Sequence, residues 1–355
     1  MALNRITTET IAVKRLQGKI ALEEAVGSPY FLAHGTHPPT PMIVGAKGGI
    51  PPYNTPFLAD IDDRLNNVEK RLKSMDASGI SYAIVSLTCP GIEGILDADG
   101  AVELAQKTND ALHDLYVKAH PDRFGFFCSV PMQKPEEAAK ELERSVKQLG
   151  AKGVLINGFT NIDKTNVSNV QYLDDPKCEP FWSKLSELGV PLYLHPRIPP
   201  LDQQRIYVSY PNLAQAAYGF GVETAGHALR IMCSGILDRY SKVQIILGHC
   251  AESLPFLVHR IDHRMAIGIR GTNGPYKESM MYYLQNKFYA TLAGVRREST
   301  LRNTLEEMGE ARTLFSVDYP YESNEDAADW FDGLQFNENT RNAIGYENAR
   351  RLFNL

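Results

Sequence analysis

Three potential metal ligands stand at the ends of three separate, mostly apolar segments of this 355-residue chain: Glu23, His195 and Asp318. A carboxylate that ends a buried strand is costly unless it is paired or bound to a metal. One imidazole and two carboxylates suit a divalent ion such as Zn²⁺ or Mn²⁺. Each side chain could instead make a separate hydrogen bond or salt bridge. Their shared position at predicted strand ends favours a single metal site.

The segment that carries Glu23 has the pattern of a strand with two faces. Simple alternation places Ala21 and Glu23 on one face and Ile20 and Leu22 on the other. We therefore expect Glu23 to share the orientation of Ala21.

A second candidate histidine has a carboxylate three residues after it. His249 follows an apolar run and a glycine, and Glu252 can return to orient its ring. A carboxylate on one imidazole nitrogen fixes the tautomer and raises the basicity of the ring. The pattern therefore predicts a catalytic pair. The alternative is a carboxylate favoured by a helix start, beside a hydrogen-bonded histidine.

Further polar side chains are candidates for contacts with a substrate. Thr291 ends another predicted strand, and Arg71 lies in a predicted helix. His227 and Arg230 share one stripe of a helix predicted to begin at residue 222. If its first turns reach the site or a subunit contact, Arg230 could hold a carboxylate in its fork. The alternative is that the three helical residues belong to the solvated outer faces of their helices.

Positioning these side chains requires a regular scaffold, which the hydrophobic pattern predicts. Apolar, β-branched segments alternate with amphipathic ones from residue 18 onward. This alternation indicates an α/β fold with a parallel sheet, and eight units favour a (β/α)8 TIM barrel over an open doubly wound sheet. In such barrels the active site lies at the carboxyl ends of the strands. The predicted strands are residues 19–23, 82–87, 124–130, 153–157, 191–195, 243–248, 288–292 and 313–317.

The chain is expected to form one main domain. Residues 1–17 are predicted to be an N-terminal arm, and residues 18–355 a single barrel domain. A long loop rich in Pro and Gly is predicted at residues 33–56, where a barrel would place it at the catalytic face. Residues 338–353 are predicted to form a C-terminal helix on the outside.

Composition excludes several classes of protein. The formal net charge of −5 and the sequence pI of about 6.0 argue against nucleic acid as a partner. No apolar run is long enough for a transmembrane helix, so no membrane partner is expected. Five widely spaced cysteines without a CxxC motif suit reduced thiols and a cytoplasmic protein. Walker A, dinucleotide-binding and GxSxG motifs are absent, which disfavours P-loop enzymes, nicotinamide dehydrogenases and serine hydrolases.

Four motifs in order resemble the decarboxylase branch of the amidohydrolase superfamily, and within it the ortho-hydroxybenzoate decarboxylases. The motifs are KIALEEA at 19–25, YLHPR at 193–197, IILGH at 245–249 and LFSVDYP at 314–320. The resemblance runs from about residue 17 to the C-terminus.

The resemblance implies a metal-dependent barrel with specific roles for several residues. Glu23, His195 and Asp318 match the metal ligands of the family, and His249, backed by Glu252, matches its second catalytic histidine. Asn157 matches an asparagine of the substrate pocket. Ala25 stands where some relatives and the related hydrolases have a histidine, so the first strand supplies at most one ligand and a two-metal hydrolase is disfavoured.

The predicted activity is the reversible, non-oxidative decarboxylation of an ortho-hydroxybenzoate-type acid, which releases CO₂ and a phenol. One divalent ion, Zn²⁺ or Mn²⁺, would bind the substrate, and Asp318 would deliver the proton. The first alternative is a mononuclear metal-dependent hydrolase or hydratase acting on a lactone, an amide or a ring-cleavage product. The second is a non-catalytic barrel that assembles with a partner. The family is usually dimeric or tetrameric, so a homodimer or homotetramer is expected.

Overall fold

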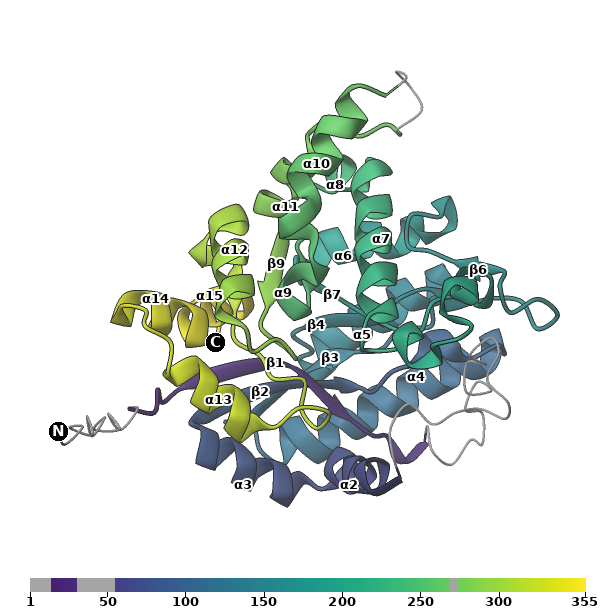
Figure 1. Ribbon diagram of the computed structural model, residues 1–355. Coiled ribbons are helices and arrows are strands. Elements are labelled where there is room, and N and C mark those ends of the chain that lie inside the picture. Colours follow the sequence, from purple (N-terminus) through teal and green to yellow (C-terminus); the bar gives the residue numbers. More distant parts are fainter. Residues whose placement is uncertain (1–13, 31–54, 269–273) are drawn as a thin grey trace.

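The computed structural model describes residues 14–30, 55–268 and 274–355, and its centre is a parallel β-barrel (Figure 1). The strands follow one another in the order β1-β2-β3-β4-β7-β8-β9-β10. All eight predicted strands are present, and the predicted (β/α)8 architecture is confirmed. Their bounds are Lys19–Val26 (β1), Ile80–Leu87 (β2), Phe124–Cys128 (β3), Gly153–Asn157 (β4), Leu192–His195 (β7), Ile245–Leu247 (β8), Phe288–Thr291 (β9) and Thr313–Leu314 (β10).

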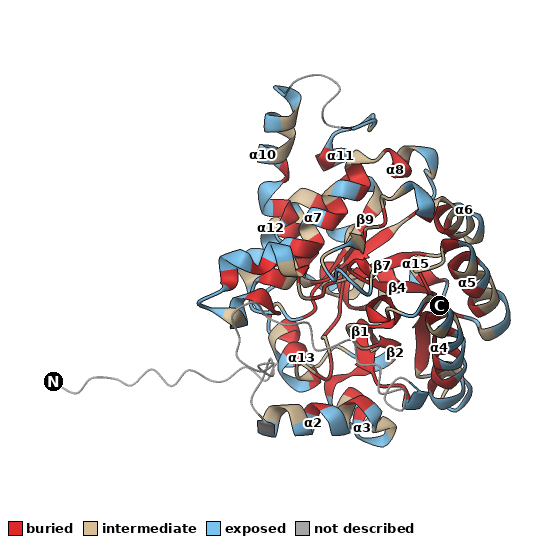
Figure 2. Cartoon of the chain, turned by 90° about the vertical axis from the view of Figure 1, so that its right-hand side faces the viewer, coloured by how far each residue is buried: buried red, intermediate tan, exposed pale blue. Residues whose placement is uncertain are grey.

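Two apolar layers hold the barrel together. Large side chains from alternate strand positions, such as Leu22, Phe127 and Ile246, fill the interior. The opposite strand faces, with residues such as Val85 and Leu194, pack against the surrounding helices. The strands are accordingly buried, while the helices present exposed outer faces (Figure 2). This rigid scaffold brings the carboxyl ends of the strands to one end of the barrel.

Helices surround the barrel, and their order follows the predicted alternation with local differences. Their bounds are Thr55–Asn66 (α2), Val68–Ser78 (α3), Ala98–Leu112 (α4), Pro135–Leu149 (α5), Glu179–Leu188 (α6), Gly219–Cys233 (α7), Ile236–Arg239 (α8), Leu254–Ala266 (α10), Met280–Lys287 (α11), Glu298–Met308 (α12), Asn324–Asp332 (α13), Glu338–Asn342 (α14) and Asn348–Phe353 (α15). α10 extends away from the barrel in Figure 1.

The hydrophobic pattern predicts one helix over residues 63–78 and one over residues 222–240, and the structure divides each into two. Residues 63–78 belong to α2 and α3, because the side chain of Asn67 accepts a hydrogen bond from the Lys70 amide and starts a new helix. Residues 222–240 belong to α7 and α8. α11 was not predicted. The C-terminal helix expected at 338–353 is α14 and α15 joined by a π-helical turn, Ala343–Glu347.

The predicted arm and long loop fall mainly outside the described residues, which exclude 1–13 and 31–54. The last residues of the arm are attached to the barrel: Arg15 forms ion pairs with Asp329 at 2.6 Å and with Asp332 at 3.3 Å. The division into an arm and a single domain therefore stays a prediction. Among the described helices, none combines the length and the apolar character needed to span a membrane.

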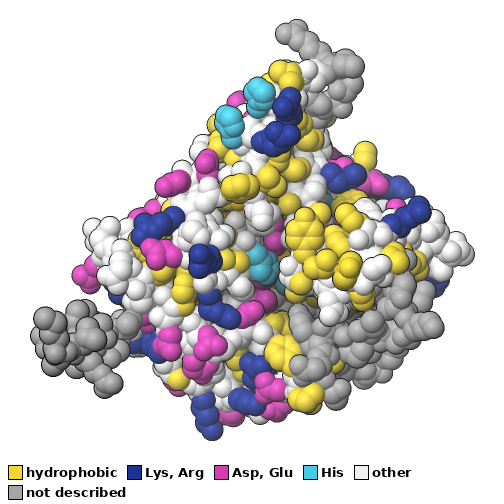
Figure 3. Space-filling model, in the orientation of Figure 1, with side chains coloured by type: hydrophobic (Ala, Val, Ile, Leu, Met, Phe, Trp, Pro, Cys, Tyr) yellow, Lys and Arg dark blue, Asp and Glu magenta, His cyan; other side chains and the backbone are white. Residues whose placement is uncertain are grey.

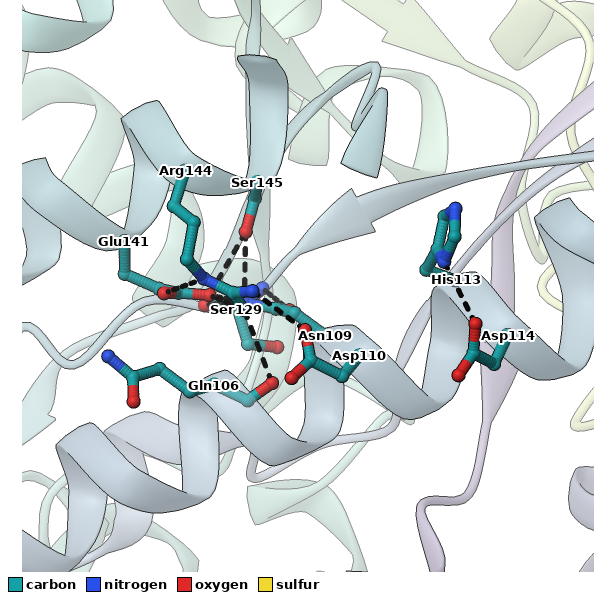
Figure 4. A network of polar contacts seen from close by, with 9 residues as sticks. All are labelled: Gln106, Asn109, Asp110, His113, Asp114, Ser129, Glu141, Arg144 and Ser145. Atoms are coloured by element: carbon teal, nitrogen blue, oxygen red, sulfur yellow. Dashed lines mark hydrogen bonds and ion pairs between the residues drawn. The ribbon is translucent and has the colours of Figure 1, made fainter. Parts of the chain in front are cut away.

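A buried polar network fixes the end of β3 (Figure 4). The Asn109 side chain, on α4, donates to the Ser129 carbonyl and accepts from the Ser129 amide, both at 2.8 Å. It also donates to Glu141 Oε1 on α5 at 2.7 Å, and Arg144 pairs with the same carboxylate. The side chain of Asn109 on α4 thus holds the backbone of Ser129, the residue that follows β3.

Candidate active site

Glu23, His195 and Asp318 converge at the carboxyl end of the barrel. Each offers one ligand atom, and the three atoms all lie within 4.8 Å of one another. His195 Nε2 is 3.3 Å from Glu23 Oε1. Burial raises the pKa of both Glu23 and Asp318. Like-charge repulsion adds to both shifts, from Asp318 on Glu23 and from Glu322 and Glu252 on Asp318. The three side chains predicted to form one metal site are therefore close enough to share a cation.

The donor set fits a divalent ion. Glu23 Oε1 is buried and makes no hydrogen bond to the described residues. Burial lowers the pKa of His195, which favours the neutral imidazole that a metal requires. Two carboxylates and one imidazole leave coordination positions open for a substrate, as catalytic metal sites do.

A bulge in β1 points Glu23 into the site. Between Ala21 and Glu24 the register with β2 shifts, so β1 carries one more residue than its partner. Leu22 belongs to the barrel interior, and Glu23 also contacts interior side chains. The expectation that Glu23 shares the orientation of Ala21 is therefore wrong, because a bulge re-aims a side chain that simple alternation would place outside.

Two hydroxyl groups hold the second oxygen of Glu23. Tyr193 donates a hydrogen bond to Glu23 Oε2. Thr291 lies 3.4 Å from the same oxygen and 3.0 Å from the Tyr193 hydroxyl, and it is fully buried. The structure places Thr291 against the carboxylate of a candidate metal ligand, and its expected contact with the substrate stays a prediction.

His249 is oriented by Glu252, as the spacing predicts. His249 Nδ1 lies 2.8 Å from Glu252 Oε1, and His249 Nε2 lies 3.8 Å from Glu23 Oε1 and 3.9 Å from Asp318 Oδ2. Burial alone would lower the pKa of His249, but the carboxylates of Glu252 and Glu23 raise its pKa well above the usual value. These carboxylates therefore favour the protonated form of the ring.

The turn that carries this pair has an unusual backbone. All residues from His249 to Ser253 have positive φ, between 52° and 64°, so the segment labelled α9, His249–Glu252, winds with the left hand. Asp318 is also left-handed, with φ 78°. Such conformations cost non-glycine residues roughly 1–2 kcal/mol each. They cluster here beside the candidate ligands, as strained backbone often does at functional sites.

A cavity of about 510 Å³ opens beside these residues. Its polar wall contains His195, His249, Glu252 and Asp318. Figure 3 shows a histidine at the bottom of a hollow, with acidic side chains next to it and hydrophobic ones beside it. The apolar wall is formed by residues that suit an aromatic ring: Pro90, Pro196, Ile198, Phe220, Val295 and Tyr321.

Asn157 is not among the described residues that line the cavity. It ends β4, is buried, and donates from Nδ2 to Glu93 Oε2 at 3.3 Å. Its Oδ1 has no hydrogen-bond partner among the described residues. The substrate-binding role of Asn157 stays a prediction.

Three other candidate side chains make structural contacts away from the cavity. Arg71 is buried, donates to the Ala25 carbonyl at 2.5 Å and stacks on the Tyr319 ring at 4.5 Å. His227 Nε2 accepts from the Leu173 amide at 3.0 Å. Arg230 forms a two-pronged ion pair with an aspartate, Asp174, at 2.8 and 2.9 Å. The structure therefore does not bring these three residues to the described cavity.

Sequence reasoning did not select three residues that the structure places in or next to the site. Tyr193 could have been found, because it lies two positions before His195 on the same strand face. Arg197 lines the cavity, stacks on Phe159 at 4.1 Å and follows His195 by two residues. Gln215 lines the cavity, but it lies in an irregular segment whose pattern gives no signal.

Arg197 lies near two buried carboxylates. Its guanidinium donates to the Phe159 carbonyl at 2.8 Å and to Asn161 Oδ1 at 2.9 Å. Burial raises the pKa of Glu93 and of Glu223 to about 7 each, and the positive charge of Arg197 opposes both shifts. The part of the cavity that Arg197 lines therefore has two buried carboxyl groups nearby, those of Glu93 and Glu223.

Comparisons with known proteins agree with this geometry. Residues 35–355 match the family described as "Amidohydrolase". Gamma-resorcylate decarboxylase from Rhizobium sp. (strain MTP-10005) is 39% identical over 341 residues, which cover 96% of this chain and 99% of that protein.

Two solved structures share the fold over nearly their full lengths. The crystal structure of 2,6-dihydroxybenzoate decarboxylase complexed with 2,6-dihydroxybenzoate has a TM-score of 0.87 at 39% identity, covering 96% of this chain and 100% of that one. Dihydroxybenzoic acid decarboxylase from Polaromonas sp. JS666, with bound manganese and the inhibitor 2-nitroresorcinol, has a TM-score of 0.86 at 39% identity, covering 96% and 98%. The predicted resemblance is confirmed, and the chain belongs to the amidohydrolase family.

Proposed function

We propose that this protein is a metal-dependent, non-oxidative decarboxylase of an aromatic acid that carries a hydroxyl group ortho to its carboxylate. The observation that carries the proposal is the cluster of Glu23, His195 and Asp318, two members of which, His195 and Asp318, line a cavity that also has many apolar lining residues. Relatives of similar length are gamma-resorcylate and 2,6-dihydroxybenzoate decarboxylases, and one of them was crystallised with manganese. This supports Mn²⁺ as the ion, with Zn²⁺ as the alternative.

Glu23, His195 and Asp318 would hold the ion, which when bound supplies a Lewis acid for the carboxylate and the ortho oxygen of the substrate. The reaction consumes one proton. Asp318 would transfer it to the ring carbon that bears the carboxylate. The bond between that carbon and the carboxylate carbon then breaks, its electron pair returns to the ring, and CO₂ leaves. The position of Asp318 supports its role as the acid, because its side chain lines the cavity and its Oδ2 lies 3.9 Å from His249 Nε2.

His249 would bind the substrate and help to return a proton to Asp318. Its Nε2 faces Asp318 Oδ2 at 3.9 Å, while Glu252 holds Nδ1. A protonated ring at this position favours an anionic oxygen of the substrate.

Gln215 supports a substrate with an additional oxygen on the ring. Its side chain lines the cavity and is largely buried, and Nε2 has no hydrogen-bond partner among the described residues. A buried donor without a partner costs about 1–3 kcal/mol. A hydroxyl or methoxy oxygen on the bound ring would satisfy it.

The proposal is tested with a panel of benzoates and protein loaded with one equivalent of Mn²⁺. Salicylate-type acids should release CO₂, whereas benzoate and 3-hydroxybenzoate should not, because neither can chelate an ion through an ortho oxygen. Comparable turnover of benzoate would refute chelation. Hydrolysis of a lactone without reaction of any aromatic acid would make the protein a metal-dependent hydrolase instead.

Exposed apolar side chains support the expected homodimer or homotetramer. Ile206 and Phe256 are each 79% exposed, and Tyr210 is 70% exposed. α10 also carries histidine and arginine side chains at positions 259, 260, 263 and 264. Figure 3 shows basic and histidine side chains together on the projecting part of the molecule. Exposed apolar groups of this size are typical of interfaces. The five cysteines are free, which supports the predicted cytoplasmic location.

A further inference from the structure

The first and last strands of the barrel, β1 and β10, are not joined by a regular ladder of backbone hydrogen bonds in the described residues. We call the junction between these two strands the seam. β1 pairs with β2, and β10 pairs with β9. Between β1 and β10, the described residues form one isolated bridge, Glu24 to Tyr319, with an Ala25 amide that donates to the Tyr319 carbonyl at 2.8 Å. The seam consists of these two edges.

Two buried side chains supply further hydrogen bonds across the seam. Ser316 Oγ accepts from the Glu23 amide at 2.7 Å and from the Leu22 amide at 3.2 Å. In the opposite direction, Glu24 Oε1 accepts from the Val317 amide at 3.3 Å. Each edge therefore uses a side chain to satisfy the backbone of the other.

These hydrogen bonds lie at or directly next to the candidate metal ligands Glu23 and Asp318. The two amides bound by Ser316 belong to the bulge that points Glu23 into the site. The amide bound by Glu24 belongs to the residue before Asp318, whose own φ is 78°. Ser316 and Glu24 are each only 2% exposed, so water does not readily replace them.

We propose that Ser316 and Glu24 are positioning residues for the metal site, and that the ion in turn holds the seam closed. The inference rests on the metal site of the proposed function. An ion bound to Glu23 and Asp318 connects the first strand to the segment after the last one. Metal binding and closure of the barrel therefore stabilise each other. Groups that orient metal ligands typically change metal affinity by 10–100-fold when they are removed.

The test measures Mn²⁺ affinity directly, by competition with a chelator, and not through activity. Ser316→Ala should weaken Mn²⁺ binding by 10–100-fold. The matched control is Ser78→Ala, because the Ser78 hydroxyl is equally buried but has no hydrogen-bond partner among the described residues. It should bind Mn²⁺ like the unmodified protein. Equal affinity of a folded Ser316→Ala protein and the control would overturn the proposal.

A measurement on the unmodified protein covers the case in which Ser316→Ala does not fold. Hydrogen exchange is followed for residues 20–25 and 315–319 with and without Mn²⁺. Both segments should exchange more slowly with the ion, while β3 and β4, which carry none of the three candidate ligands, should change little. Unchanged exchange at the seam on saturation with Mn²⁺ would refute the coupling. If the unmodified protein binds no Mn²⁺ at all, the proposed function itself fails.

Discussion

His249 lies close to the candidate metal ligands, yet its Nδ1 is held by Glu252. We therefore expect His249→Asn to retain about one Mn²⁺ per chain while kcat falls by on the order of 10²–10⁴, the range for a lost acid–base group. Glu252→Gln should reduce kcat less, since it only orients and charges the ring. Metal analysis and CO₂ release measure the two effects. Loss of the ion from the His249 variant would make this residue a ligand.

Asp318 combines two roles that His249 does not share. Asp318→Asn should lose both metal affinity and the proton donor, so its activity should be the lowest of these variants. In the unmodified protein, reaction in D₂O should place one deuterium on the ring carbon that loses the carboxylate, detectable by mass spectrometry and NMR. A product without deuterium would contradict protonation by a group that exchanges with solvent.

Among the elements, the left-handed turn after β8 carries a conformational cost that a glycine would relieve. Ser253 is exposed and has φ 64°. Ser253→Gly should raise the free energy of unfolding by about 0.5–1 kcal/mol, because glycine adopts this conformation without strain. Thermal melting should show an increase of about 1 °C. Ser253→Ala, which keeps the strained backbone, should show no such gain; an equal gain would place the effect in the side chain.

The start of α7 should make stability depend on pH. Burial raises the pKa of Glu223 from the usual 4.5 to about 7, against the opposing effects of Arg197, Tyr172 and Arg230 and with a further rise from Glu252. The folded state therefore holds a proton that the unfolded state releases. This contribution is complete below about pH 4.5 and is lost as the pH rises through about 7.

Glu223→Gln removes this titration. The melting temperature of Glu223→Gln minus that of the unmodified protein should increase steadily between pH 5 and pH 8. Glu338→Gln, at the start of the surface helix α14, is the control and should show a constant difference. A constant difference in melting temperature between Glu223→Gln and the unmodified protein would mean that the Glu223 carboxyl titrates alike in the folded and unfolded states.

At the scale of the whole molecule, the projecting helix α10 supports self-association. Phe256 is 79% exposed near the start of this helix. Phe256→Asp should convert the expected dimer or tetramer into smaller species, measured by light scattering after size exclusion. Lys118→Asp, an exposed charge on another face of the barrel, is the control. A monomeric unmodified protein would contradict the expected assembly.

The barrel and its ligand cluster were predictable because both depend on local patterns. Nearly every predicted strand ends in or beside a polar residue, and strand order follows chain order, so Glu23, His195 and Asp318 had to meet. Gln215 was not predictable, since it reaches the cavity through an irregular segment. Thr291 was assigned to the substrate because sequence shows that a hydroxyl ends a strand, but not that Tyr193 and Glu23 lie opposite it. The orientation of Glu23 depended on a bulge that only the pairing with β2 defines.

The position of the seam has a consequence for biosynthesis. Its two edges are far apart in the chain, since Asp318 follows Glu23 by 295 residues (318 − 23). Chains emerge from the ribosome N-terminus first, and domains fold as units. A nascent chain therefore cannot assemble the candidate metal site before β10 and Asp318 have been made. A prematurely terminated chain that ends before β10 should retain no tightly bound metal.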